Sequence, residues 1–165
     1  MKKGFTMIEL IFVIVILGVL ASVAIPRLAA TRDDAEVAKA ATNLTTAVSD
    51  LTAYYTAKGS FKDSGGTNDV TFDKITNALT KDGKLNVKGK TTCVKVELPT
   101  VNNAAASDKV QLTLKFTGNT GDNDAVCKQL KKLPGIKSMC GKSGDGESIS
   151  ADCKIQIGGS GGIQF

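Results

Sequence analysis

Nearly every side chain is apolar in the first long segment of the chain, from Phe5 to Ile25, and Glu9 is the one charged residue in it. As a helix at about 1.5 Å per residue, this segment would be roughly 31 Å long, which is enough to span a bilayer. The pattern therefore predicts a membrane-directed helix with one acid near its start.

The helical pattern continues after this segment, because no Gly or Pro occurs between Arg27 and Ala57. Apolar residues recur there at steps of three and four, the spacing of one helical face. They are Val37, Ala41, Leu44, Val48, Leu51 and Tyr55. We predict one helix of about fifty residues that ends at Lys58 and packs this face against the chain's own domain. Gly18 and Pro26 are its expected kink points, because proline removes one backbone hydrogen bond.

Beyond the helix, apolar and polar residues alternate, which is typical of half-buried antiparallel strands. The alternation occurs at residues 94–98, 110–116 and 154–157, and we expect a tight turn at 158–162 before a terminal strand at 163–165. The predicted fold class is α+β, with a long kinked helix packed on a small antiparallel sheet.

Two short helices are expected outside these strands. Residues 58–92 predict a polar loop that contains one of them, built on Phe72, Ile75 and Leu79. The other spans Ala125 to Leu133, with capping candidates at 122–124, and ends before Pro134.

Composition limits the chain to one modest domain plus one extended element. It has 165 residues, of which 22% are charged and only 5% aromatic, so the core is small. The net charge is +5, two units of which come from Lys2 and Lys3 ahead of the apolar segment. The remaining charge is too weak and too scattered to indicate nucleic acid.

The N-terminal segment has an alternative interpretation as a secretory signal peptide. Lys2 and Lys3 would form its basic region, and Ser22-Val23-Ala24 fits a small-x-small cleavage site. Against this, the apolar segment begins directly after Gly4, is long enough to span a bilayer, and leads into further helix. It also contains Glu9, and a carboxylate in hydrocarbon is costly and usually functional.

The start of the chain has a specific resemblance. Lys2-Lys3-Gly4-Phe5-Thr6-Met7-Ile8-Glu9-Leu10, followed by an apolar helix with a proline at Pro26, closely resembles the start of type IV prepilins and the related pseudopilins. In that family a membrane peptidase cuts after the glycine, here Gly4, and N-methylates the new terminus, here Phe5. The resemblance covers about the first thirty residues and implies that Glu9 is needed for assembly.

The resemblance implies a pilin fold and a structural subunit of a type IV pilus-like helical filament, without catalysis of its own. The precursor would lie in the inner membrane, where the positive-inside preference holds Lys2 and Lys3 at the cytoplasmic face. The product would be a periplasmic or extracellular filament. Implied partners are other copies of the chain, the prepilin peptidase, the pilus or secretion assembly machinery and minor pilins or pseudopilins. The implied segments are a removed leader at 1–4, a transmembrane and filament-core helix at 5–26, its amphipathic continuation at 27–58 and a globular head at 59–165.

Physical chemistry gives Glu9 a role in such a filament. Cleavage after Gly4 leaves an ammonium on Phe5, and methylation keeps its charge. A buried ammonium and a buried carboxylate each need a partner, and Glu9 lies about one helical turn from Phe5. A neighbouring subunit displaced along the filament can therefore set its own terminal amine against Glu9.

Two alternatives stay open. Within the family, the chain is a pseudopilin of a type II secretion or DNA-uptake system. Outside the family, it is a secreted or membrane-anchored periplasmic binding module. A mature chain that starts at Phe5 favours a filament, whereas a start at Ile25 favours a signal peptide.

Four cysteines predict two disulfides in an exported chain. They form no Cys-x-x-Cys motif and the sequence has no histidine, which excludes the usual zinc and redox spacings. Of the three possible pairings we prefer Cys93–Cys127, which joins the first predicted strand to the later helix, with Cys140–Cys153 closing a local loop. Such a loop also resembles the cysteine-bounded region of many pilins.

Motifs for catalysis and metal binding are incomplete. Residues 158–162 satisfy G-x-S-x-G, but a hydrolase of that type needs a histidine base, which this sequence does not contain. We therefore expect no enzymatic activity and no cofactor. Two acidic clusters are calcium candidates, although solvated turns are the favoured interpretation because neither forms a complete ligand loop. Their residues are Asp122, Asp124, Asp145 and Glu147.

Overall fold

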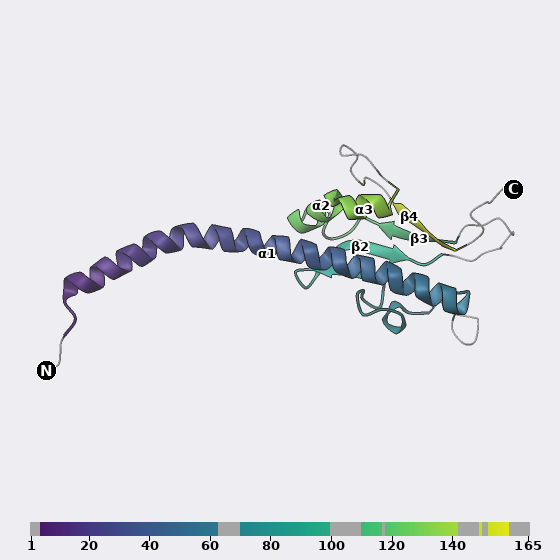
Figure 1. Ribbon diagram of the computed structural model, residues 1–165, viewed down its shortest axis with the longest axis horizontal. Coiled ribbons are helices and arrows are strands. Elements are labelled where there is room, and N and C mark those ends of the chain that lie inside the picture. Colours follow the sequence, from purple (N-terminus) through teal and green to yellow (C-terminus); the bar gives the residue numbers. More distant parts are fainter. Residues whose placement is uncertain are drawn as a thin grey trace. The chain divides into compact units, whose positions relative to one another are not determined.

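The computed structural model describes residues 4–62, 70–99, 110–116, 118–141, 149 and 152–158. The chain divides into two compact units, Met1–Ala35 and Glu36–Phe165, and helix α1 (Met7–Lys58) belongs to both (Figure 1). The first unit contains the residues before α1, the apolar start of α1 and the more polar turns that follow it as far as Ala35. The second unit is a small α+β domain, which confirms the predicted fold class.

Helix α1 confirms the single long helix that the sequence predicts, since it has 52 residues and ends at Lys58. Gly59 follows with a φ of 71°, a left-handed conformation that suits glycine and stops the helix. Its N–H donates to the Tyr55 carbonyl at 2.7 Å. The helix runs through Gly18 and Pro26 without a break, and a kink at these two residues stays a prediction.

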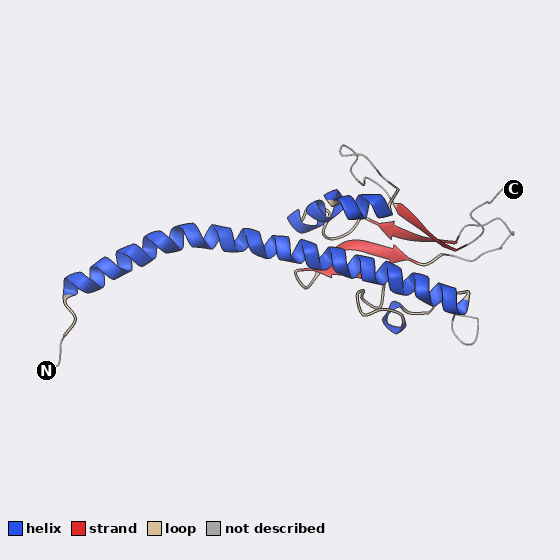
Figure 2. Cartoon of the chain, in the orientation of Figure 1, coloured by secondary structure: helices blue, strands red, loops and turns tan. Residues whose placement is uncertain are grey.

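The second unit contains a four-stranded antiparallel sheet in the order β1-β2-β3-β4 (Figure 2). Leu85 lies opposite Val94 across the first pair of strands. In the other two pairs, Val96 lies opposite Leu114, and Leu112 opposite Ile155. The strands are β1 (Lys84–Val87), β2 (Thr91–Glu97), β3 (Val110–Lys115) and β4 (Cys153–Gly158). The three alternating segments of the sequence therefore form β2, β3 and β4.

Part of α1 packs into the core of this unit, as predicted, but its buried face is centred differently. The predicted positions Ala41, Val48 and Tyr55 are only partly buried, whereas Ala40 and Ala47 are buried completely or nearly so. Alanine is short, so it lets the helix backbone approach its neighbours more closely than a branched side chain would. The fully buried face comprises Val37, Ala40, Leu44, Ala47 and Leu51.

The segment predicted as a polar loop, 58–92, contains a strand as well. Strand β1 buries Leu85 and Val87 and pairs with β2 through a turn in which Lys88 and Gly89 both have positive φ. The expected short helix is only a single 3-10 turn, η1 (Phe72–Lys74), and Leu79 is buried without being helical. The alternation in β1 covers four residues and lies among lysines and glycines, so the segment was interpreted as a polar loop.

Two helices follow β3. Helix α2 (Ala125–Lys132) matches the predicted helix and begins at Asp124, whose side chain accepts a hydrogen bond from the Val126 N–H at 2.8 Å. It ends before Pro134 as expected. A second helix, α3 (Pro134–Met139), was not predicted. Proline at the first helical position has a suitable φ and lacks only an N–H that would be unpaired there, so Pro134 starts this helix.

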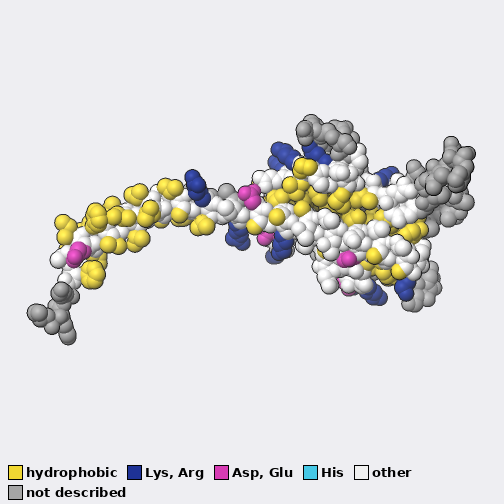
Figure 3. Space-filling view, in the orientation of Figure 1, with side chains coloured by type: hydrophobic (Ala, Val, Ile, Leu, Met, Phe, Trp, Pro, Cys, Tyr) yellow, Lys and Arg dark blue, Asp and Glu magenta, His cyan; other side chains and the backbone are white. Residues whose placement is uncertain are grey.

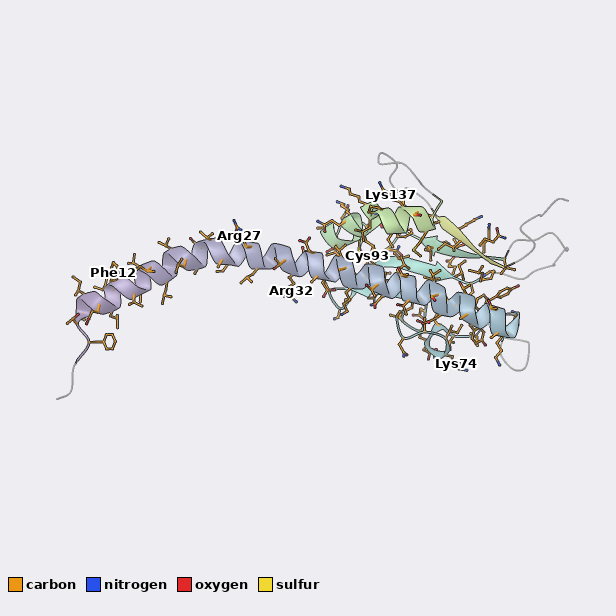
Figure 4. The ribbon with its side chains drawn as sticks, viewed as in Figure 1. Phe12, Arg27, Arg32, Lys74, Cys93 and Lys137 are labelled. Atoms are coloured by element: carbon orange, nitrogen blue, oxygen red, sulfur yellow. A yellow bond between two sulfur atoms is a disulfide. The ribbon has the colours of Figure 1, made fainter. Side chains whose placement is uncertain are left out.

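Two disulfides hold the second unit together. Cys93 of β2 is bonded to Cys127 of α2, with their Cα atoms 5.1 Å apart, and Figure 4 shows where Cys93 lies. Cys140 is bonded to Cys153 of β4, with a Cα–Cα distance of 5.2 Å. This is the pairing that we preferred from the sequence.

Several expected features fall outside the described residues. They are the leader lysines Lys2 and Lys3, the acidic residues Asp145 and Glu147, the glycine-rich turn after Gly158, and the terminal strand at 163–165.

Candidate functional site

The apolar part of α1 exposes an apolar surface, shown in yellow in Figure 3. Sixteen large apolar side chains between Phe5 and Leu28 are exposed, from 43% for Ile16 to 86% for Phe5. By length and composition, Met7–Ile25 could cross a membrane. A surface of this kind is unfavourable in water, so it needs lipid or protein around it.

Glu9 takes part in a capping box at the start of α1. The Thr6 N–H donates to Glu9 Oε2 at 2.9 Å, and the Thr6 hydroxyl donates to the same oxygen at 2.7 Å. In return, the Glu9 N–H donates to Thr6 Oγ1 at 3.3 Å. Because the first N–H groups of a helix have no partner within it, this arrangement satisfies two of them and fixes the helix start.

The capping box also orients the carboxylate. Both Thr6 donors bind Oε2, and within the described part of the chain no hydrogen bond reaches Glu9 Oε1. The carboxylate is exposed in the first turn of a helix, where the helix dipole favours a negative charge. The arrangement can therefore offer one oxygen to a cation that approaches from outside the chain.

The predicted cleavage site lies immediately before this turn. Gly4 and Phe5 are exposed and belong to no helix or strand. A Cβ added at Gly4 would meet no atom within 4 Å, so the fold does not require glycine there. Gly4, Phe5 and Glu9 thus fall within six consecutive residues, whereas Lys2 and Lys3 lie outside the described residues.

Sequence reasoning missed Thr6, although the signal was present. The motif Thr6-Met7-Ile8-Glu9 has the Thr-x-x-Glu spacing of a capping box directly before an apolar helix. The prediction treated Glu9 only as a partner for another subunit. In the structure, Glu9 also has a hydrogen-bond partner within its own chain, Thr6.

The described calcium candidates have structural roles. Asp122 Oδ2 accepts a hydrogen bond from the Gly118 N–H at 2.7 Å, and Oδ1 lies 3.6 Å from Lys131 Nζ. Asp124 caps α2 and lies 3.5 Å from Lys88 Nζ. No group of three potential metal ligands occurs among the residues that the structure describes. Calcium binding was not the favoured interpretation of these acids, and it stays untested.

Comparison with known proteins finds a match at the start of the chain. The family model of the prokaryotic N-terminal methylation motif matches residues 1–25. No curated protein and no solved structure matches the chain. The matched segment contains Gly4, Phe5 and Glu9, and together with the apolar helix it points to insertion into a membrane. The chain therefore carries at its N-terminus the class III signal of type IV pilins and pseudopilins.

Proposed function

We propose that the chain is a structural subunit of a type IV pilus-like helical filament, assembled from the inner membrane after cleavage between Gly4 and Phe5. The proposal rests on one observation: the start of α1 exposes an apolar surface and has one acid in its first turn. Lipid can cover this surface before assembly, and the helices of neighbouring subunits can cover it afterwards. The methylation motif supports the same function.

Glu9 would select the position of the neighbouring subunit. Burial of this carboxylate among apolar helices is costly unless it gains a cationic partner. Cleavage creates such a cation at Phe5, and the neighbour's terminal amine can approach the free Oε1 while Thr6 holds Oε2. The uncut chain has no ammonium at Phe5, so assembly would wait for the prepilin peptidase. Further partners would be the assembly machinery and minor subunits.

Three variants separate this role from helix capping. Glu9→Gln keeps a side-chain oxygen for the Thr6 donors but removes the charge, whereas Glu9→Val removes both. We expect both variants to be processed and to stay in the membrane. Filament yield should fall at least about tenfold, because loss of one partner of a buried ion pair costs several kcal/mol. Thr6→Val is the matched control, since it keeps the carboxylate and the hydrogen bond from the Thr6 N–H but loses both hydrogen bonds of the Thr6 hydroxyl, a loss of about 1 kcal/mol.

The measurement is the mass of filaments sheared from cells, compared with the processed chain that remains in the membrane. Thr6→Val should keep most of the parent's filament yield. Normal filament yield from Glu9→Gln would contradict charge pairing. Equal losses from Thr6→Val and Glu9→Val, with a normal yield from Glu9→Gln, would show instead that Glu9 acts by capping the helix.

A further inference from the structure

Helices α2 and α3 carry a basic face on the second unit. From Ala125 to Lys142 the sequence contains five lysines and no acid. Lys128 and Lys132 are exposed on α2, and Lys137 is half-buried on α3. We call these three residues the lysine face. Lysine side chains stand out in dark blue over α2 and α3 in Figure 3, and Figure 4 labels Lys137.

The fold explains the lysine face only in part, because Lys132 and Lys137 lie in the last turns of α2 and α3, where the helix dipole favours a cation. The opposite side of α2 supplies Val126, Cys127 and Leu130 to the core, and Lys131 pairs with Asp122. By contrast, no member of the lysine face forms an ion pair with another described residue. Lys128 and Lys132 are four residues apart on one helix, where like charges are slightly destabilising. An external anionic partner would offset this repulsion.

The contacts of α2 place its first turn beside the start of the second unit. Asp124, which caps α2, lies 3.5 Å from Lys88 Nζ, and the Lys88 N–H donates to Glu36 Oε2 at 3.4 Å. Glu36 comes eleven residues after Ile25, the end of the apolar span. At about 3.5 Å per residue, this length of chain limits Glu36 to roughly 40 Å from the end of the span.

We propose that the lysine face rests on the anionic phospholipid headgroups of the membrane that holds the apolar span, in the subunit that has not yet assembled. The inference rests on the membrane insertion that is part of the proposed function. A span in the bilayer keeps the second unit near the surface, so even weak attraction is effective. Each lysine close to an anionic membrane favours the surface-bound state by about fivefold.

A lipid surface fits these observations better than nucleic acid. The lysine face contains no aromatic side chain on which bases could stack. Lysine is a compact point charge on a flexible stem, suited to a surface of headgroups without fixed geometry. The apolar span also keeps the second unit close to the membrane, whereas a free polyanion would have to bind from solution.

The chain contains no tryptophan, which allows a specific reporter. Gln129→Trp places a single indole on the exposed side of α2 next to Lys128. The full chain carrying this substitution is reconstituted into vesicles that contain a lipid with a nitroxide on its headgroup, which quenches nearby tryptophan. We expect stronger quenching in vesicles rich in phosphatidylglycerol than in pure phosphatidylcholine. The difference should vanish at about 1 M salt, where the screening length is about 3 Å.

Two charge-matched triple variants test whether the lysine face is responsible. Lys128→Gln/Lys132→Gln/Lys137→Gln should shift the equilibrium away from the surface by about 100-fold and abolish the extra quenching. The control, Lys74→Gln/Lys84→Gln/Lys154→Gln, removes the same charge from exposed positions outside α2 and α3. This variant should retain the extra quenching in anionic vesicles. Equal behaviour of the two variants, or equal quenching in both lipids, would overturn the inference.

Flotation of the vesicles at high salt separates failure of this inference from failure of membrane insertion. A chain that floats with both kinds of vesicle but shows no quenching specific to anionic lipid is inserted, and only the lysine-face inference is then wrong. A chain that floats with neither is not inserted, which overturns insertion and the inference together.

Discussion

Gly121 connects the loop after β3 to the disulfide in the core. Its N–H donates to the Thr92 carbonyl at 3.0 Å. A Cβ at this position would lie 2.6 Å from Cys127 Sγ and 2.7 Å from the Thr92 oxygen. Neither atom can move easily, because one belongs to a buried disulfide and the other to the backbone of β2.

Gly121→Ala should therefore destabilise the second unit by about 1–3 kcal/mol, the usual cost of overpacking a core. The measurement is the free energy of unfolding in urea. Gly135→Ala is the control, since a Cβ there meets nothing within 4 Å and alanine favours helix α3. A Gly121→Ala variant as stable as the Gly135→Ala variant would contradict the steric argument.

Glu97 joins two strands through ion pairs on the sheet. Its carboxylate lies 2.9 Å from Lys115 Nζ and 3.2 Å from Lys95 Nζ. The hydrogen bond from Lys115, with help from Lys95, holds the pKa of Glu97 below its ordinary value of 4.5, although partial burial opposes this shift. A carboxyl group whose pKa is lowered by folding stabilises the fold above its unfolded pKa and loses that contribution as the pH falls through the folded pKa.

Glu97→Gln should cost about 0.5–1 kcal/mol of unfolding free energy near pH 7, a modest value because the ion pairs are partly exposed. The difference between parent and variant should shrink as the pH falls below about 4.5. Urea unfolding of the parent and the variant at a series of pH values measures this difference in unfolding free energy. A difference that stays constant into acid would show that the charge of Glu97 is not responsible.

At the scale of elements, the clearest predictions came from long patterns. The 3.6-residue period identified α1, alternation over five or more residues identified β2 and β3, and a four-residue alternation identified β4. Strand β1 was missed although its alternation is as long as that of β4, because Leu85 and Val87 lie in a segment rich in lysine and glycine that reads as a polar loop. Ala40 and Ala47 were missed because alanine is common on both buried and exposed helix faces, so only the packed structure distinguishes them.

The two disulfides close loops of different length, with sequence separations of 34 and 13 residues. A cross-link restricts the unfolded chain more when its loop is longer. Replacement of Cys93 and Cys127 by alanine should therefore cost about 4 kcal/mol, against about 3 kcal/mol for Cys140 and Cys153. Both double variants are compared with the parent by urea unfolding. An equal or larger loss from the shorter loop would contradict this order.

At the scale of the whole molecule, the chain combines an apolar helical unit with a disulfide-bonded α+β unit. The sequence predicted the cleavage site and Glu9 because the family's motif occupies consecutive residues near the N-terminus. The bonds between Thr6 and Glu9 were not predicted, although the Thr-x-x-Glu spacing before an apolar helix was a signal for them. The lysine face depended on the structure, because the sequence alone does not distinguish Lys131, which is paired, from Lys128 and Lys132.

The central claim is that the chain becomes a filament subunit after cleavage between Gly4 and Phe5. Mass spectrometry of the N-terminal peptide from filaments sheared off cells tests it most directly. Gly4→Leu is a control for processing, because the fold does not require glycine at this position. We expect a filament protein that begins with N-methylated Phe5 in the parent, and an uncut chain absent from filaments in the variant. Absence of the parent chain from filaments, or a mature start at Ile25, would contradict it.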